Sequence, residues 1–149
     1  MDIIKFFEAT AEYAFKDQSL PKEALLAAGA STCRKDVEGD PRGNKRLALI
    51  GDALIRLELV DQWHTTGASP GTTQKVISQK ASNKNLEKIG RGAGLARYII
   101  SHPAQKHVAR TTLASAVEAL VGAVWLDSSK DYATVRRVVR ALNIDPTSR

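Results

Sequence analysis

Apolar side chains recur every three or four residues through most of the chain, the spacing that gathers them on one face of an α-helix. Stretches that alternate strictly between apolar and polar residues, as half-buried strands do, do not occur in the sequence. The pattern therefore predicts an all-α fold. The expected helices span residues 3–15, 21–28, 45–64, 73–92, 111–126 and 131–142, with a joint near Asn83 and a short apolar segment at 95–100.

Polar segments rich in turn residues separate these helices. Residues 31–43 contain glycine and proline and are expected to form an exposed loop, and residues 101–110 form a basic loop. Asn44 is predicted to cap the long helix that follows it, because a short polar side chain can accept a hydrogen bond from the first free amides. Thr111 or Thr112 is expected to cap its helix in the same way.

Composition and charge narrow the classes of protein. The chain has 149 residues, enough for one compact domain spanning 1–149. Its net charge of +6 favours a polyanionic partner, although many small domains are equally basic. Cys33 is the only cysteine, which excludes an intramolecular disulfide and is typical of a reducing compartment. There is neither an apolar run of about 18 residues nor a secretory leader pattern, so we expect a cytoplasmic or nuclear protein.

One helix carries an isolated carboxylate. Between Arg110 and Asp127 the only charged residue is Glu118, in a segment that is otherwise apolar on all sides. A carboxylate in such a helix is costly unless a cation, a metal ion or several hydrogen-bond donors compensate it. A structural ion pair with a lysine or arginine is one explanation, and a divalent-cation site is the other.

The long helix at 45–64 offers an acidic neighbour. Lys45, Ala48 and Asp52 are spaced i, i+3, i+7 and so share one face. Gly51, beside Asp52, and Gly122, four residues after Glu118, lack the side chains that keep two helices apart. We therefore expect the two helices to pack closely, with the Asp52 and Glu118 carboxylates facing each other.

Three blocks of sequence resemble the ribonuclease III family. Residues 44–53, NKRLALIGDA, resemble its signature N-E-R-L-E-F-L-G-D-A, and residues 113–128 resemble its second motif, L-A-D-x-x-E-A-L-I-G-A-x-x-L-D-S. Residues 81–95 are similar to the family's V-S-N-E-N-L block, and the likeness runs in order from about residue 10 to 142. The resemblance implies a helical nuclease domain that forms two-fold dimers and binds double-stranded RNA.

The chain departs from the family at its acidic positions. The resemblance implies two Mg²⁺ ions held by four carboxylates, at the positions of Ala48, Asp52, Ser115 and Glu118. Two of these acids are missing, and Lys45 replaces a further glutamate of the signature. Because Mg²⁺ depends on charged oxygen ligands, we expect metal binding by Asp52 and Glu118 to be weak or absent, and catalysis to be lost or severely impaired.

Three functions remain open: an inactive RNA-binding domain in RNA processing, protection or assembly, an active endoribonuclease with a minimal Mg²⁺ site, and a scaffold without RNA binding. One hypothesis places the Lys45 ammonium where the metal would lie, in a salt bridge with Asp52 and Glu118. The alternative is that Lys45 points to solvent at the start of its helix.

Further residues are candidates for binding RNA or a second protein chain. A solvated surface is the alternative explanation of the basic residues. If the helix is continuous, a basic stripe is formed by Lys80, Lys84, Lys88 and Arg91. The candidate dimer contacts are Leu49, Ile55 and Leu59. We expect solvent-facing side chains at Arg136, Arg137 and Arg140, with phosphate contact as the alternative. The chain is expected to form a homodimer or a heterodimer with an active relative, and to contain no separate double-stranded-RNA-binding domain.

Overall fold

The structure, a computed structural model, describes residues 3–101 and 108–145 and confirms the all-α class. Within these ranges the only β-type pairing is a single bridge between Leu26 and Ile100. None of the described helices is long and apolar enough to cross a membrane. The elements are α1 (Ile3–Ala11), α2 (Ser19–Ala24), α3 (Ala30–Cys33), α4 (Lys45–His64), α5 (Pro70–Lys80), α6 (Asn83–Gly92), the 3-10 helix η1 (Leu95–Tyr98), α7 (Arg110–Asp127) and α8 (Tyr132–Ala141).

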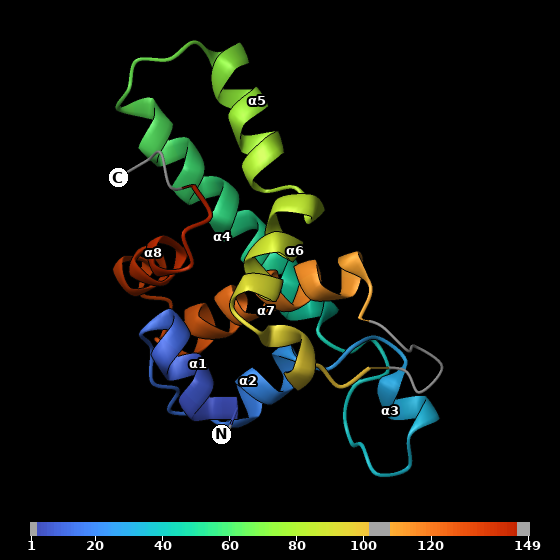
Figure 1. Ribbon diagram of the computed structural model, residues 1–149. Coiled ribbons are helices and arrows are strands. Elements are labelled where there is room, and N and C mark those ends of the chain that lie inside the picture. Colours follow the sequence, from blue (N-terminus) through green and yellow to red (C-terminus); the bar gives the residue numbers. More distant parts are fainter. Residues whose placement is uncertain (1–2, 102–107, 146–149) are drawn as a thin grey trace.

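Helix α7 lies at the centre of the fold. Most of its side chains are buried, as the apolar sequence of this segment requires. Its most extensive contact is with α4, and α6 is its next largest neighbour (Figure 1). Helices α1 and α8 contact each other at one end of α7. The core is built mainly from aliphatic side chains, the largest of which include Leu47, Ile55, Leu59, Leu86, Leu113 and Leu120.

Helices α4 and α7 touch through their backbones. A side-chain carbon at Gly51 would overlap the main-chain carbonyl of Glu118, and one at Gly122 would overlap that of Leu47. Each helix therefore contributes one glycine that admits the main chain of the other. The close packing expected from these two residues is confirmed, and it brings the side chains flanking them into one site.

The C-terminal end of α7 anchors the segment after α1. The carboxylate of Asp127 is buried and accepts hydrogen bonds from the Tyr13 hydroxyl at 2.7 Å and from the amides of Lys16 and Asp17 at 2.9 and 2.8 Å. Three donors compensate a charge that would otherwise be costly in the interior. These bonds attach the N-terminal segment to the central helix.

Several helix boundaries differ from the predictions. Helix α1 ends at Ala11 rather than at residue 15, because Glu12 adopts a left-handed conformation with φ of 57°. Helix α2 lies earlier than expected, and α3 occupies part of the predicted loop. The limits of α4 and the joint before Asn83 are as predicted. Most of the predicted basic loop lies outside the described residues.

The predicted helix caps are wrong. The Asn44 side chain does not cap α4 but donates to the carbonyl of Ala24 at 2.8 Å. With φ −87° and ψ 9°, Asn44 lacks the extended backbone typical of a capping residue, and its buried side chain ties α2 to α4 instead. Helix α7 starts at Arg110, before both threonines. Side-chain caps occur at Ser69 and Ser82, which begin α5 and α6.

We predict that Gly51→Ala destabilises the protein by about 1–3 kcal/mol, the usual cost of overpacking a core, because the new methyl group forces α4 and α7 apart. Denaturant unfolding measures the change. Gly71→Ala in α5 is the matched control: nothing lies within 4 Å of the added carbon, so its stability should be unchanged or higher by up to about 1 kcal/mol. Equal effects of both substitutions would contradict the backbone contact.

Candidate functional site

Asp52 and Glu118 meet where α4 crosses α7. Gly51, next to Asp52, touches the main chain of Glu118 itself, so the backbone contact places the two acids side by side. The Asp52 side chain is 39% exposed and Glu118 is half-buried. The structure therefore brings together the two acidic residues that the sequence singled out.

The electrostatic surroundings of Glu118 are mixed. Its pKa is raised to about 7, first by burial and then by the hydrogen bond and the negative charge of Asp52. The positive charges of Lys45 and Arg56 act in the opposite direction. With a pKa of about 7, Glu118 retains its proton for part of the time near neutral pH, which lowers the negative charge of the site.

Lys45 reaches across from α4 to α7. Its ammonium donates a hydrogen bond to the Ser115 hydroxyl at 2.9 Å, and the bond is partly buried. The hypothetical salt bridge with Asp52 and Glu118 is not found among the ion pairs of the described residues, and the ammonium bonds to the Ser115 hydroxyl instead. The alternative, in which Lys45 points only to solvent, is also wrong. Lys45 acts on Glu118 through space rather than by direct contact.

Arg56 is a residue of the site that sequence reasoning missed. Its guanidinium Nε lies 3.1 Å from the Asp52 carboxylate. The spacing of the two residues, i and i+4 on one helix, was a sufficient signal for this pair. The site therefore contains two acids and two cations.

Comparison with known proteins identifies the family. The sequence-family model of the ribonuclease III domain matches residues 45–129 of this chain. Ribonuclease 3 of Syntrophotalea carbinolica is 33% identical over 144 residues, which cover 92% of this chain and 60% of that protein. The chain belongs to the ribonuclease III family. Ribonuclease 3 of Fusobacterium nucleatum subsp. nucleatum is 31% identical over 129 residues, covering 83% of this chain and 54% of that protein, so the chain spans a little over half the length of these relatives.

Solved structures confirm the ribonuclease III fold. The nuclease domain of ribonuclease III from Campylobacter jejuni matches with a TM-score of 0.80 at 22% identity, covering 94% of this chain and 96% of that one. A second structure of the same domain has a TM-score of 0.79 at 23% identity, covering 96% and 95%. The helical arrangement of the family is thus retained at low sequence identity.

The residues at this ribonuclease III site do not fit a pair of Mg²⁺ ions. Ala48 is buried and offers no ligand atom, and Ser115 offers a neutral hydroxyl that already accepts the Lys45 ammonium. One remaining acid is paired with Arg56. No group of three or more acidic, histidine or cysteine side chains that could hold a metal ion is found in the described chain. Magnesium requires several hard, charged oxygen ligands, and these side chains do not supply them.

The predicted basic stripe of this ribonuclease III domain is broken. Lys80 is the last residue of α5, whereas Lys84, Lys88 and Arg91 belong to α6, so the four do not share one helical face. The interruption occurs because the Ser82 side chain caps a new helix. Lys84 and Lys88 are exposed one turn apart, while Arg91 pairs with Glu87 at 3.2 Å.

The predicted dimer contacts divide into two groups. Leu49 is 74% exposed on α4, as an intermolecular contact requires, but Ile55 and Leu59 are each 1% exposed and belong to the core. The helical period turns these two residues toward the core and away from Leu49. Leu57 and Val60, 51% and 45% exposed, continue the exposed apolar stripe instead.

A buried charge on α4 was also missed. Glu58 is 0% exposed and accepts hydrogen bonds from Gln62 Nε2 at 2.6 Å and from the Tyr132 hydroxyl at 2.7 Å. Arg136 and Arg140 lie within ion-pair distance of the same carboxylate, so their predicted role as purely solvent-facing residues is wrong. Glu58 follows Gly51 by seven residues, and this helical spacing already placed it on the inner face.

Proposed function

We propose that this chain is a ribonuclease III domain that binds double-stranded RNA and does not cleave it. The observation that carries the proposal is the Lys45 ammonium, held 2.9 Å from the Ser115 hydroxyl between α4 and α7. Family resemblance places metal-binding acids at the positions of Ser115 and of Ala48, which lies one helical turn after Lys45. A cation belonging to the protein thus lies where the family's pattern calls for acidic side chains around metal ions.

Charge at the site favours binding over hydrolysis. Lys45 and Arg56 supply two positive charges against Asp52 and a Glu118 whose pKa is raised to about 7. Such a site attracts phosphate oxygens, but it lacks two of the acids that would hold the metal-bound water implied for hydrolysis in this family. The exposed Lys84 and Lys88 on α6 add further positive charge. Because duplex RNA is read mainly by shape and backbone, such contacts give affinity with little sequence preference.

The exposed stripe of α4 supports a dimer. Leu49, Leu57 and Val60 lie at i, i+8 and i+11, so they share one face of the helix, opposite the buried Glu58. Isologous dimers bury such self-complementary apolar surfaces. The nuclease domain from Campylobacter jejuni has a structurally flexible region involved in dimer formation. We propose that α4 forms the two-fold contact here, most simply in a homodimer.

A minimal nuclease is the second candidate function. It is favoured by the meeting of Asp52 and Glu118, which retains half of the acidic set implied by the family. The cations on both sides of the pair argue against it, because a divalent ion would have to displace or approach them. A cleavage assay separates the two candidates.

RNA binding is tested by gel shift with a long RNA duplex at several salt concentrations, in EDTA and in Mg²⁺. We expect the same affinity in both buffers and a steep fall with salt. Lys84→Gln/Lys88→Gln should reduce the slope of log affinity against log salt by about one for each phosphate group that the variant no longer binds. Lys22→Gln/Lys35→Gln removes equal charge from exposed positions elsewhere and should leave the slope nearly unchanged. Binding that requires Mg²⁺, or no binding, would contradict the proposal.

Cleavage is tested with the same duplex in Mg²⁺ or Mn²⁺. The wild-type chain should give no product above background. The variant Lys45→Glu/Ala48→Glu/Ser115→Asp restores the acids implied by the family and should cleave at least about 100-fold faster, the scale of the effect of one electrostatic group in an active site. Adding Asp52→Ala to that variant should abolish the product. Wild-type cleavage that depends on Asp52 would instead establish the minimal nuclease.

The dimer is tested by light scattering during gel filtration. Leu49→Asp/Leu57→Asp should halve the particle mass, because each charge would be buried in the apolar contact. Leu126→Asp alters an exposed leucine on α7, 40% accessible, and should leave the mass unchanged. A monomeric wild-type chain, or a variant that remains dimeric, would refute this interface.

A further inference from the structure

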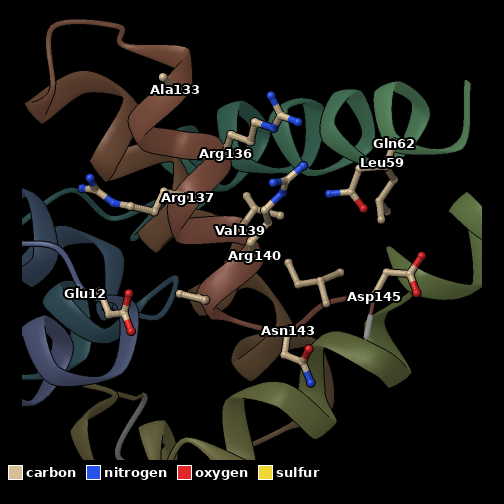
Figure 2. Close-up of a pocket in the computed structure, with 12 residues that line it drawn as sticks. Glu12, Leu59, Gln62, Ala133, Arg136, Arg137, Val139, Arg140, Asn143 and Asp145 are labelled. Carbon is tan, nitrogen blue, oxygen red and sulfur yellow. The ribbon is translucent and has the colours of Figure 1, made fainter. Parts of the chain in front are cut away.

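A cavity of about 770 Å³ lies beside α8, bounded by α4 and by the chain that follows α8 (Figure 2). Its walls combine apolar side chains with arginines and amides. None of the residues of the Asp52–Glu118 site lines it. The lining includes Leu59, Gln62, Arg136, Val139, Arg140 and Ile144.

The buried Glu58 holds two arginines at the cavity wall. Arg136 and Arg140 approach the same carboxylate oxygen through their Nε atoms, each at 3.4 Å. Successive turns of α8 carry the two side chains, which extend toward Gln62 and Leu59 in Figure 2. One carboxylate thus positions two guanidinium groups side by side.

The outer ends of both guanidinium groups remain available. Their side chains are 44% and 49% exposed, and within residues 3–101 and 108–145 their Nη atoms donate no hydrogen bond. Planar guanidinium groups bind phosphate through pairs of parallel N–H bonds. Fixing the Nε edge on Glu58 lowers the entropy lost when the Nη edges bind an anion.

The cavity is also lined by Asp145, Glu12 and Arg137. Asp145 is buried and accepts a hydrogen bond from the indole of Trp63 at 2.9 Å. Glu12 and Arg137 lie on the opposite side of the cavity from Gln62 in Figure 2. The wall formed by Arg136 and Arg140 is therefore the part of the cavity best suited to an anion.

The apolar walls define the rest of the ligand. Leu59, Val139 and Ile144 form the buried floor of the cavity, each at most 3% exposed, and Ala133 and Ala141 contribute accessible aliphatic surface above it. Gln62 contributes an amide whose Nε2 donates to Glu58. The amide oxygen of Gln62 is buried and accepts no hydrogen bond from the described residues. The volume lies within the range of about 300–1,000 Å³ typical of small-molecule sites. A ligand that carries a ring system and a phosphate group matches this combination of guanidinium groups, an amide and aliphatic surface.

We propose that this cavity binds a nucleoside phosphate, with the phosphate on Arg136 and Arg140 and the base and sugar against the accessible aliphatic surface of α8. The nucleotide is either free or the 5′-phosphorylated end of an RNA strand, since both present the same chemistry. The inference is independent of the proposed function, because it uses neither the Asp52–Glu118 site nor α6.

Isothermal titration with ADP, and separately with short single-stranded RNA carrying a 5′-phosphate or a 5′-hydroxyl, tests the site in the full chain. Arg136→Lys/Arg140→Lys keeps the charge that compensates Glu58 but removes the forked donors, and should weaken binding at least tenfold. Glu58→Gln/Arg136→Gln/Arg140→Gln removes anchor and cations together, avoids an uncompensated buried charge, and should abolish binding. Ala133→Trp places a large ring at an exposed position of the lining and should also block it.

Lys22→Gln/Lys35→Gln is the control for nonspecific charge and should bind within twofold of wild type. Binding of ADP supports a site for a free nucleotide, and binding of the 5′-phosphorylated strand but not of the 5′-hydroxyl strand supports a site for an RNA end. If neither ADP nor the 5′-phosphorylated strand shows saturable binding, the inference is overturned. Binding that the lysine double variant leaves unchanged overturns it as well, whatever the outcome of the duplex RNA experiments.

Discussion

The contact between the backbones of α4 and α7 is the constraint on which the rest of this structure depends. Gly51 admits the main chain of Glu118, and Gly122 admits that of Leu47. With larger residues at these positions the helices would separate, and Lys45 would no longer reach Ser115 on the opposite helix. The same contact turns the inner face of α4 toward the core, and this places Glu58 in the interior. Two glycines thus determine the positions of two groups of charged side chains.

The periodicity of the sequence was sufficient to predict the all-α class, whereas the specific fold was implied by the family resemblance. The apolar spacing located α4, α7 and the joint before α6, because long amphipathic or wholly apolar helices leave a strong pattern. The ends of the helices were less predictable. A left-handed residue at Glu12 and a buried asparagine at position 44 depend on tertiary contacts that no local pattern records.

The candidate site was predictable in its membership but not in its pairing. Family resemblance and helical spacing together selected Lys45, Asp52 and Glu118. They did not predict which group would accept a hydrogen bond from the Lys45 ammonium, because a flexible lysine side chain reaches several positions with similar geometry. In the structure the acceptor is the Ser115 hydroxyl. The ion pairs of Glu58 were missed for a different reason. Taken separately in the sequence, Glu58, Arg136 and Arg140 resemble ordinary surface residues, and only the packing of α8 against α4 brings them together.

Lys45 has a consequence for how such a domain responds to its surroundings. A bound magnesium ion exchanges with the solution, so a surface that relies on it weakens when the free metal is scarce. An ammonium group is covalently attached to α4 and cannot dissociate. The positive charge between α4 and α7 is therefore part of the chain itself and does not depend on the concentration of metal ions in the cell.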